Sequence, residues 1–186
     1  QMYWFVHLAI ITELNGWDAM NPGHFDQHLT PFYEREIEAG TLTRERAKEL
    51  LSCFWIKVNN HPAPPKVGIT AAESGTYNDF TNINIGGLTK KGKDGVSEVS
   101  YIMLEIIEEL HILQPGSSIH ISNLTPDKFL EKGCKVIRCG YGYPSVFNTD
   151  IYIKELERQG KTHADALEGG CSGCIEVGAF GKEAFL

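Results

Sequence analysis

The chain has 186 residues, which is long enough for one domain with a sizeable core. Its apolar share of 42% and charged share of 22% are those of a folded globular protein rather than of a disordered one. The formal net charge is −7 and no cluster of Lys and Arg is present, which argues against a nucleic-acid partner. Charged residues interrupt the apolar runs well before the roughly 20 residues that a membrane span requires.

Cysteine usage and the chain ends suggest where the protein works and how complete it is. Five cysteines is an odd number, far from the density of a disulfide-rich scaffold, so we expect a reducing, cytoplasmic environment. The sequence starts within the amphipathic run YWFVHLAIITELNG and stops just after its most glycine-rich loop. We therefore expect residues 1–186 to be the central part of a larger domain that is incomplete at both ends.

The predicted elements after that run are one helix between two long irregular stretches. The stretches are NGWDAMNPGHFDQHLTPFY and NNHPAPPKVGITAAESGTYNDFTNINIGG. Loops longer than about 15 residues are uncommon unless they are functional or disordered, and the aromatic and apolar content here argues against disorder. The helix is expected in LTRERAKELLSCFWIKV, where Thr43 is the cap and apolar residues recur at helical spacing from Ala47 to Val58.

Helices and short strands are predicted to alternate in the second half. SEVSYIMLEIIEELHIL has an apolar stripe of helical period, and residues 117–122 and 144–148 are short apolar runs typical of buried strands. A further helix is expected to start with Thr125 as N-cap and Pro126 as its first residue, and to stop at Gly140. The last helix, from residue 150 to 159, ends at Gly160.

This alternation predicts an α/β fold with a parallel sheet and crossover helices. In such folds the loops that follow the carboxyl ends of the strands usually carry the chemistry. We therefore expect the glycine-rich loop near the end of the chain to be one of the connections of an α/β core.

That loop, GGCSGCIEVGAFGKEAFL, has three interpretations. Its two cysteines could be half of a metal site, a redox pair, or a loop that presents one reactive sulfur beside a carboxylate. A redox pair is expected at a strand-to-helix turn near the start of a chain, which disfavours the second interpretation here. For the first, four thiols (Cys134, Cys139, Cys171 and Cys174) would make the chain a non-catalytic zinc-binding module.

Spacing weakens the zinc interpretation. Cys134 and Cys139 are five residues apart in a predicted helix, so they lie on different faces, and Cys134 is expected to be buried on the apolar stripe. A second group that could bind metal, His24 with Asp26 and His28, could equally be hydrogen-bonded side chains of a polar pocket.

The third interpretation explains more of the loop. Glycines allow unusual backbone angles that bring a sulfur close to a substrate, and in an extended loop Glu176 would point to the same side as Cys174. A carboxylate hinders ionisation of a neighbouring thiol, so this sulfur is poorly suited to polar nucleophilic chemistry. A sulfur that carries hydrogen atoms needs no ionisation, and the carboxyl group could then move protons.

The loop GCSGCIEVGAFGKEA resembles the Gly-Cys-x-Glu active-site loop of glycyl radical enzymes, the pyruvate formate-lyase superfamily. The resemblance extends over the whole chain, through NPGHFDQHLTPFYEREIEAG, LQPGSSIHIS and LTPDKFLEKGCKVIRCGYGYPSVFNTD in the order of the family. Pyruvate formate-lyase itself uses two adjacent cysteines, whereas Ser172 and Gly173 separate the two cysteines here, which disfavours acetyl transfer. The sequence is most similar to the branch that dehydrates trans-4-hydroxy-L-proline to 1-pyrroline-5-carboxylate.

The resemblance implies a role for each matching residue. Cys174 would be the thiyl radical that abstracts hydrogen beside the ring nitrogen, and Glu176 the acid/base that assists loss of hydroxide. Asp18 would bind near the ring nitrogen, Ser74 near the carboxylate, and Phe80 would pack on the ring. The implied fold is the central portion of a ten-stranded α/β barrel. The alternatives left open are a diol or glycerol dehydratase and a formate C-acetyltransferase-like lyase.

The resemblance also implies how the enzyme is activated. The chain itself would bind no cofactor or metal, because the radical is stored on a glycine that these residues do not include. An activating enzyme that uses S-adenosylmethionine and an iron–sulfur cluster would install it, in a full-length protein expected to be an anaerobic homodimer. This chain alone would then be inactive. Cys171, where a small residue without a thiol is expected, and His120, at a position that varies between branches, depart from the pattern.

Overall fold

The computed structural model describes residues 2–8, 19–60, 80–173 and 175–182. Four parallel strands form one sheet in the order of the chain: β1 (Ala19–Met20), β2 (Phe80–Gly86), β3 (Gly116–Ile121) and β4 (Ser145–Asn148). Helices α5 (Glu98–Leu110) and α6 (Asp127–Arg138) join β2 to β3 and β3 to β4. The predicted α/β class with parallel strands and crossover helices is confirmed.

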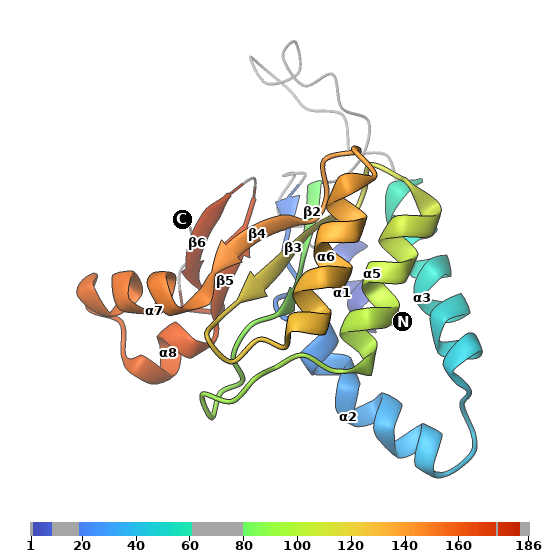
Figure 1. Cartoon of the computed structure of the whole chain (residues 1–186), viewed down its shortest axis with the longest axis horizontal. Coiled ribbons are helices and arrows are strands. Elements are labelled where there is room, and N and C mark those ends of the chain that lie inside the picture. Colours follow the sequence, from blue (N-terminus) through green and yellow to red (C-terminus); the bar gives the residue numbers. More distant parts are fainter. Residues whose placement is uncertain (1, 9–18, 61–79, 174, 183–186) are drawn as a thin grey trace.

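The other elements lie on two sides of this sheet. They are α1 (Met2–Leu8), α2 (Phe25–Glu38), α3 (Arg44–Asn59), α7 (Thr149–Arg158), α8 (His163–Leu167) and the antiparallel hairpin of β5 (Gly169–Ser172) and β6 (Glu176–Ala179). Figure 1 shows α3, α5 and α6 grouped on one side, and the hairpin with α7 and α8 on the other. Among the described residues, no helix is both long and apolar enough to cross a membrane.

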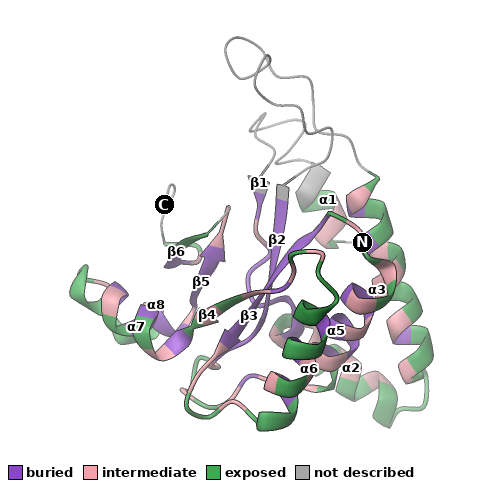
Figure 2. Cartoon of the chain, turned by 45° about the horizontal axis from the view of Figure 1, so that its top comes forward, coloured by how far each residue is buried: buried purple, intermediate pink, exposed green. Residues whose placement is uncertain are grey.

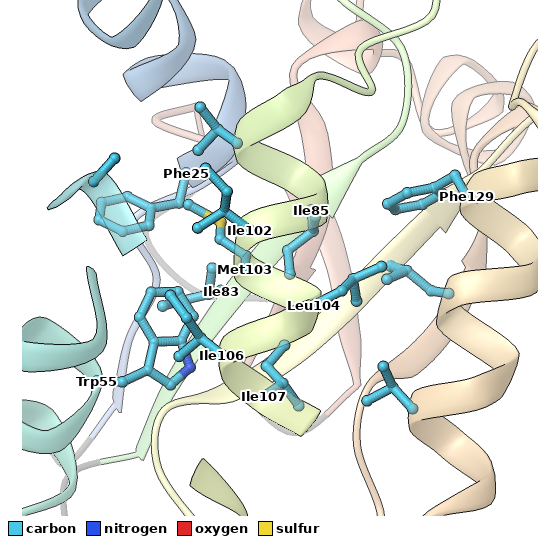
Figure 3. Packing of buried hydrophobic residues seen from close by; sticks show 14 residues of the cluster. Phe25, Trp55, Ile83, Ile85, Ile102, Met103, Leu104, Ile106, Ile107 and Phe129 are labelled. Carbon is cyan, nitrogen blue, oxygen red and sulfur yellow. The ribbon is translucent and has the colours of Figure 1, made fainter. Parts of the chain in front are cut away.

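The core lies between the sheet and its helices. Six apolar side chains of α5 are buried, so this helix is covered on almost every side: Val99, Ile102, Met103, Leu104, Ile106 and Ile107. Ile83, Ile85 and Ile119 meet them from one face of the sheet, and Figure 3 shows Trp55 and Phe129 closing the two flanks from α3 and α6. Figure 2 shows the resulting burial: β2 and β3 are largely purple, β4 is pink and green, and the outer surface of α6 is green.

Local signals account for where most helices begin and end. The side chain of Thr43 accepts a hydrogen bond from Arg46 N at 3.2 Å, as expected of the N-cap of α3. Gly140 and Gly160, which follow α6 and α7, have φ angles of 88° and 93°, which favour glycine. The predicted cap of α6 is wrong: Pro126 is the N-cap, and the hydroxyl of Thr125 instead accepts a hydrogen bond from Ser122 N at 2.8 Å.

The predicted apolar stripe of α6 is also wrong. Its buried residues are Phe129, Gly133 and Val136, whereas Cys134 is exposed and the side chain of Ile137 is 39% exposed. The reason is a close approach at Gly133, where a Cβ atom would lie 2.7 Å from Ile119 Cδ1. The helix therefore turns its glycine toward the sheet and its cysteine outward.

Three elements begin within the stretches that we expected to be irregular: the short strand β1, the helix α2 and the strand β2. α2 begins at Phe25, and β2 contains the polar sequence FTNINIG. Asparagine is depleted in strands, which hides β2 from a propensity argument. The alternation of Asn82, Ile83, Asn84 and Ile85 has the period of two that a strand with one polar and one apolar face requires.

Candidate active site

The face of the sheet that points away from α5 is polar. Asn82 and Asn84 of β2 and Ser118 and His120 of β3 alternate with the isoleucines of the core, and all four are buried. Ser118 Oγ donates a hydrogen bond to Asn82 Oδ1 at 3.1 Å, and His120 Nε2 binds Asn84 Oδ1. We call this the inner face of the sheet.

The β5–β6 hairpin lies on the inner face and is held there by side chains. At its start, Gly169 O accepts hydrogen bonds from His24 Nε2 at 2.8 Å and from the Tyr152 hydroxyl at 3.1 Å. Two residues later, Cys171 N donates to Asn84 Oδ1 at 2.8 Å, and Cys171 O accepts from Asn84 Nδ2 at 2.9 Å. The backbone groups of alternate β5 residues therefore form hydrogen bonds with side chains, in the places where a neighbouring strand would otherwise supply backbone partners.

The same contacts fix the direction of the hairpin. Cys171 lies against Asn84, whereas Gly173 O accepts a hydrogen bond from Asn82 Nδ2 at 3.3 Å, so β5 runs opposite to β2. The turn from residue 173 to 175 accordingly approaches the amino-terminal end of β2, where Phe80 pairs with Ala19. Our expectation that the loop is a connection after the carboxyl end of a sheet strand is wrong, because the loop belongs to a separate hairpin laid across the sheet.

Close packing explains two of the glycines. A Cβ atom on Gly170 would lie 2.6 Å from Phe180 Cζ and 2.9 Å from Asn84 Oδ1, both too close for any side chain. Gly173 has a φ of 53°, in the left-handed region that glycine adopts most easily. The first glycine lets the hairpin lie flat on the inner face, and the second forms its turn.

Glu176 is the first residue of β6, and its carboxylate folds over this turn. Glu176 Oε2 accepts a hydrogen bond from Ile175 N at 2.9 Å, and it lies 2.6 Å from where a Cβ atom on Gly173 would be. These two neighbours flank position 174. The sequence argument placed Glu176 on the same side as Cys174 if the loop is extended. The described residues on either side of position 174 form a turn, so that condition is not met.

The other predicted site residues are only partly described. Cys174, Asp18 and Ser74 lie outside the described residues, and of Phe80 the structure describes the backbone and not the side chain. The role predicted for each of these residues stays a prediction.

Two buried histidines belong to the inner face, and the sequence did not assign them to it. Burial lowers the pKa of His24 and, together with the proximity of His24, holds the pKa of His120 well below its usual value, so both are neutral. Their rings meet edge to face with centroids 5.2 Å apart. Because an amide oxygen only accepts hydrogen bonds, neutral His120 must carry its proton on Nε2, where it binds Asn84 Oδ1.

Comparison with known proteins identifies the family. The family model for pyruvate formate lyase-like proteins matches residues 1–186. The chain belongs to this family. It is 57% identical over 186 residues to the trans-4-hydroxy-L-proline dehydratase of Clostridioides difficile, and it is 30% identical over 183 residues to the (2S)-3-sulfopropanediol dehydratase of Klebsiella oxytoca. These matches cover 100% and 98% of this chain, but only 24% and 22% of the respective relatives.

Solved structures agree with the family assignment. One match is the crystal structure of the hydroxyproline dehydratase of Clostridioides difficile with trans-4-hydroxy-L-proline bound. The TM-score is 0.92, and the match covers 100% of this chain and 23% of the dehydratase chain. The glycerol-bound, B12-independent glycerol dehydratase of Clostridium butyricum is 35% identical with a TM-score of 0.86, over 96% of this chain and 22% of its own. The fold of this pyruvate formate lyase-like chain is therefore that of glycyl radical enzymes.

The three described thiols of the zinc interpretation lie on opposite faces of the sheet. Cys134 on α6 and Cys139 at its C-cap are exposed on the side of the isoleucine face, whereas Cys171 is buried on the inner face against Asn82. Within the described ranges, no three His, Cys, Asp or Glu side chains gather closely enough to hold a metal ion.

The cluster of His24, Asp26 and His28 is dispersed as well. Asp26 accepts hydrogen bonds from Gly86 N at 2.7 Å and from Ser100 Oγ, and His28 Nδ1 binds the hydroxyl of Tyr3. Each of the three residues therefore has a different partner. Their hydrogen-bonded interpretation, which the sequence left open, is the one that the geometry favours.

A large cleft beside the hairpin does not coincide with Glu176. Its volume is about 1260 Å³, and it lies between α1, the segment before α2, the loop after β2 and the outer side of the hairpin. Ser172 and Phe180 line this cleft, whereas Gly173, Ile175 and Glu176 do not. The carboxylate is therefore not assigned to this cleft.

Proposed function

We propose that this chain is the central part of the catalytic domain of a longer glycyl radical enzyme, which dehydrates trans-4-hydroxy-L-proline to 1-pyrroline-5-carboxylate. One observation carries the proposal: the β5–β6 hairpin, which carries Glu176 and adjoins Cys174 in the sequence, is held on the inner face with its turn toward the amino-terminal end of β2. The identity to a hydroxyproline dehydratase supports the choice of substrate.

Each residue of the proposed site has a defined step. The glycyl radical of the full-length enzyme would take the hydrogen atom of the Cys174 thiol and so leave a thiyl radical on the sulfur. Cys174 takes a hydrogen atom from the carbon beside the ring nitrogen, since nitrogen stabilises the carbon radical formed. Glu176 protonates the hydroxyl group on the neighbouring carbon, which then leaves as water. The S–H hydrogen returns to the substrate-derived radical, which regenerates the thiyl radical, and the N–H proton released as the C=N bond forms restores the proton of Glu176.

The other residues bind the substrate. We place Asp18 near the ring nitrogen, Ser74 near the carboxylate and Phe80 against the ring, where a carboxylate, a hydroxyl and an aromatic face match charge, hydrogen bonding and shape. The full-length enzyme is proposed to be an anaerobic, cytoplasmic homodimer activated by an S-adenosylmethionine-dependent iron–sulfur enzyme. The exposed thiols of Cys134 and Cys139 support a reducing compartment.

The test uses the full-length polypeptide that contains this chain, activated without oxygen and assayed with trans-4-hydroxy-L-proline, glycerol, propanediol and pyruvate. We expect turnover of hydroxyproline above the other three, abolished by Cys174→Ser and strongly reduced by Glu176→Gln. Cys139→Ser, which removes an exposed thiol on α6, is the matched control and keeps activity. Turnover that persists in Cys174→Ser contradicts the mechanism, and preference for a diol or pyruvate contradicts the substrate.

A further inference from the structure

Asn84 connects the inner face to the hairpin through every hydrogen-bonding group of its side chain. Its Oδ1 accepts from Cys171 N at 2.8 Å and from His120 Nε2, and its Nδ2 donates to Cys171 O at 2.9 Å and to Asn21 Oδ1 at 3.0 Å. A carboxamide has two acceptor sites and two donor hydrogens, so all four are used. Turning the amide over would set its NH₂ group against two donors and its oxygen against two acceptors.

The neighbouring asparagines extend this contact along β5. Asn21 Nδ2 also donates to Cys171 O, and Gly23 N donates to Asn21 Oδ1 at 2.7 Å, which fixes that side chain. Asn82 Nδ2 donates to Gly173 O at 3.3 Å and to Cys171 Sγ at 3.4 Å. We call Asn21, Asn82 and Asn84 the asparagine cluster; it binds the hairpin backbone up to the residue before Cys174.

We propose that Asn82 and Asn84 are positioning residues for the radical chemistry, because they set the register and depth of the hairpin and so bring the sulfur of Cys174 to the substrate hydrogen. This inference rests on the proposed function of Cys174. Transfer of a hydrogen atom requires the reacting atoms at close range, and a displacement of about 1 Å can cost about 100-fold in rate. A hydrophobic pair at these positions could bury the same area but would remove the amide groups that bind Cys171 N and Gly173 O.

Isosteric variants test the proposal in the activated full-length polypeptide. Asn84→Asp keeps the shape but faces Cys171 O and Asn21 Oδ1 with an oxygen in place of a donor, and Asn82→Asp does the same toward Gly173 O. We expect kcat per glycyl radical to fall about 10- to 100-fold. KM should change less than about threefold, because the substrate-binding groups are untouched.

Two further measurements separate positioning from folding. The glycyl radical content, measured by electron paramagnetic resonance, should equal that of the wild type. The deuterium isotope effect on kcat, with substrate deuterated beside the ring nitrogen, should rise because hydrogen transfer becomes more rate-limiting. A purely structural role would instead lower radical content and activity in proportion and leave the isotope effect unchanged. Asn59→Ala, which removes a side-chain hydrogen bond to the backbone of Gln114, is the matched control and should leave all three values unchanged.

A milder variant covers the case in which the aspartates fail to fold. Ser118→Ala removes only the hydroxyl that orients Asn82, and we expect a fall in kcat of about 3- to 10-fold with the same rise in isotope effect. The proposal is overturned if these variants keep the wild-type kcat and isotope effect while Cys174→Ser is inactive. If Cys174→Ser itself remains active, the proposed function fails first, and the positioning role fails with it.

Discussion

Replacing Gly170 with alanine measures how closely the hairpin must lie on the sheet. The added Cβ would meet Phe180 Cζ at 2.6 Å and Asn84 Oδ1 at 2.9 Å, whereas ordinary contacts begin at 3.4 Å. The nearest contact is therefore 0.8 Å too short (3.4 Å less 2.6 Å). The Asn84 amide is held by four hydrogen bonds, so the methyl group can be accommodated only if the hairpin or the ring of Phe180 moves.

A movement of the hairpin would weaken its main contact with the sheet. Relief of the Asn84 contact requires 0.5 Å (3.4 Å less 2.9 Å), and the same shift would lengthen the distance from Cys171 N to Asn84 Oδ1 from 2.8 Å to about 3.3 Å, beyond the usual hydrogen-bonding range. Overpacking of this kind costs about 1 to 3 kcal/mol of the free energy of unfolding. In the activated full-length polypeptide we expect kcat per glycyl radical to fall at least about tenfold.

A matched substitution provides the control. Gly133→Ala is the same chemical change on the opposite face of the sheet, where the only close atom is Ile119 Cδ1, the end of a flexible side chain. Alanine also favours the helix over glycine by about 1 kcal/mol, which offsets the adjustment of Ile119. We expect Gly133→Ala to keep kcat and the urea midpoint. A Gly170→Ala enzyme with wild-type kcat and wild-type midpoint would refute the close approach of the hairpin.

Three further predictions concern the frame around the site. Burial raises the pKa of Asp26 to about 7, so this group stabilises the fold most below about pH 4 and loses that contribution as the pH rises through about 7. Asp26→Asn should remove this decline in urea unfolding free energy between about pH 4 and pH 8, and a variant that keeps the decline contradicts the assignment. Phe129→Ala, at a fully buried ring, should lower the free energy of unfolding by about 3 to 5 kcal/mol in the same assay, and a loss below about 1 would show that the α6 contact is loose. Thr43→Ala should cost about 1 kcal/mol through loss of the α3 cap, and an unchanged urea midpoint would argue against that cap.

Local sequence signals were sufficient for most of the helices and for two strands. Thr43 and Gly160 mark helix ends through contacts and backbone angles that involve only neighbouring residues. The apolar stripe of α5 is equally local: the periodicity predicts burial of six residues, and all of them except Leu110 are buried (Val99, Ile102, Met103, Ile106 and Ile107). The predicted stripe of α6 failed because a periodicity argument counts apolar side chains, whereas the closest packing there occurs at Gly133.

The arrangement of the site could not be predicted from local patterns. The hairpin is held by contacts between residues far apart in the sequence, such as Cys171 with Asn84 and Gly173 with Asn82. β2 was missed because asparagine has a low strand propensity and is rarely buried without a hydrogen-bond partner. Its partners are on the hairpin, which local sequence patterns do not reveal. The resemblance to glycyl radical enzymes, in contrast, supplied Glu176, and the structure adds the turn over which its carboxylate folds.

The alternation in β2 has a consequence for how this strand can change during evolution. Ile83 and Ile85 serve the hydrophobic core, while Asn82 and Asn84 between them hold the hairpin. Inserting or deleting one residue would exchange the isoleucines and the asparagines. The amides would then be buried in the hydrophobic core, and the aliphatic side chains would face the backbone of the hairpin. We expect length variation in related chains to be confined to the flanking loops, with no insertions or deletions within β2.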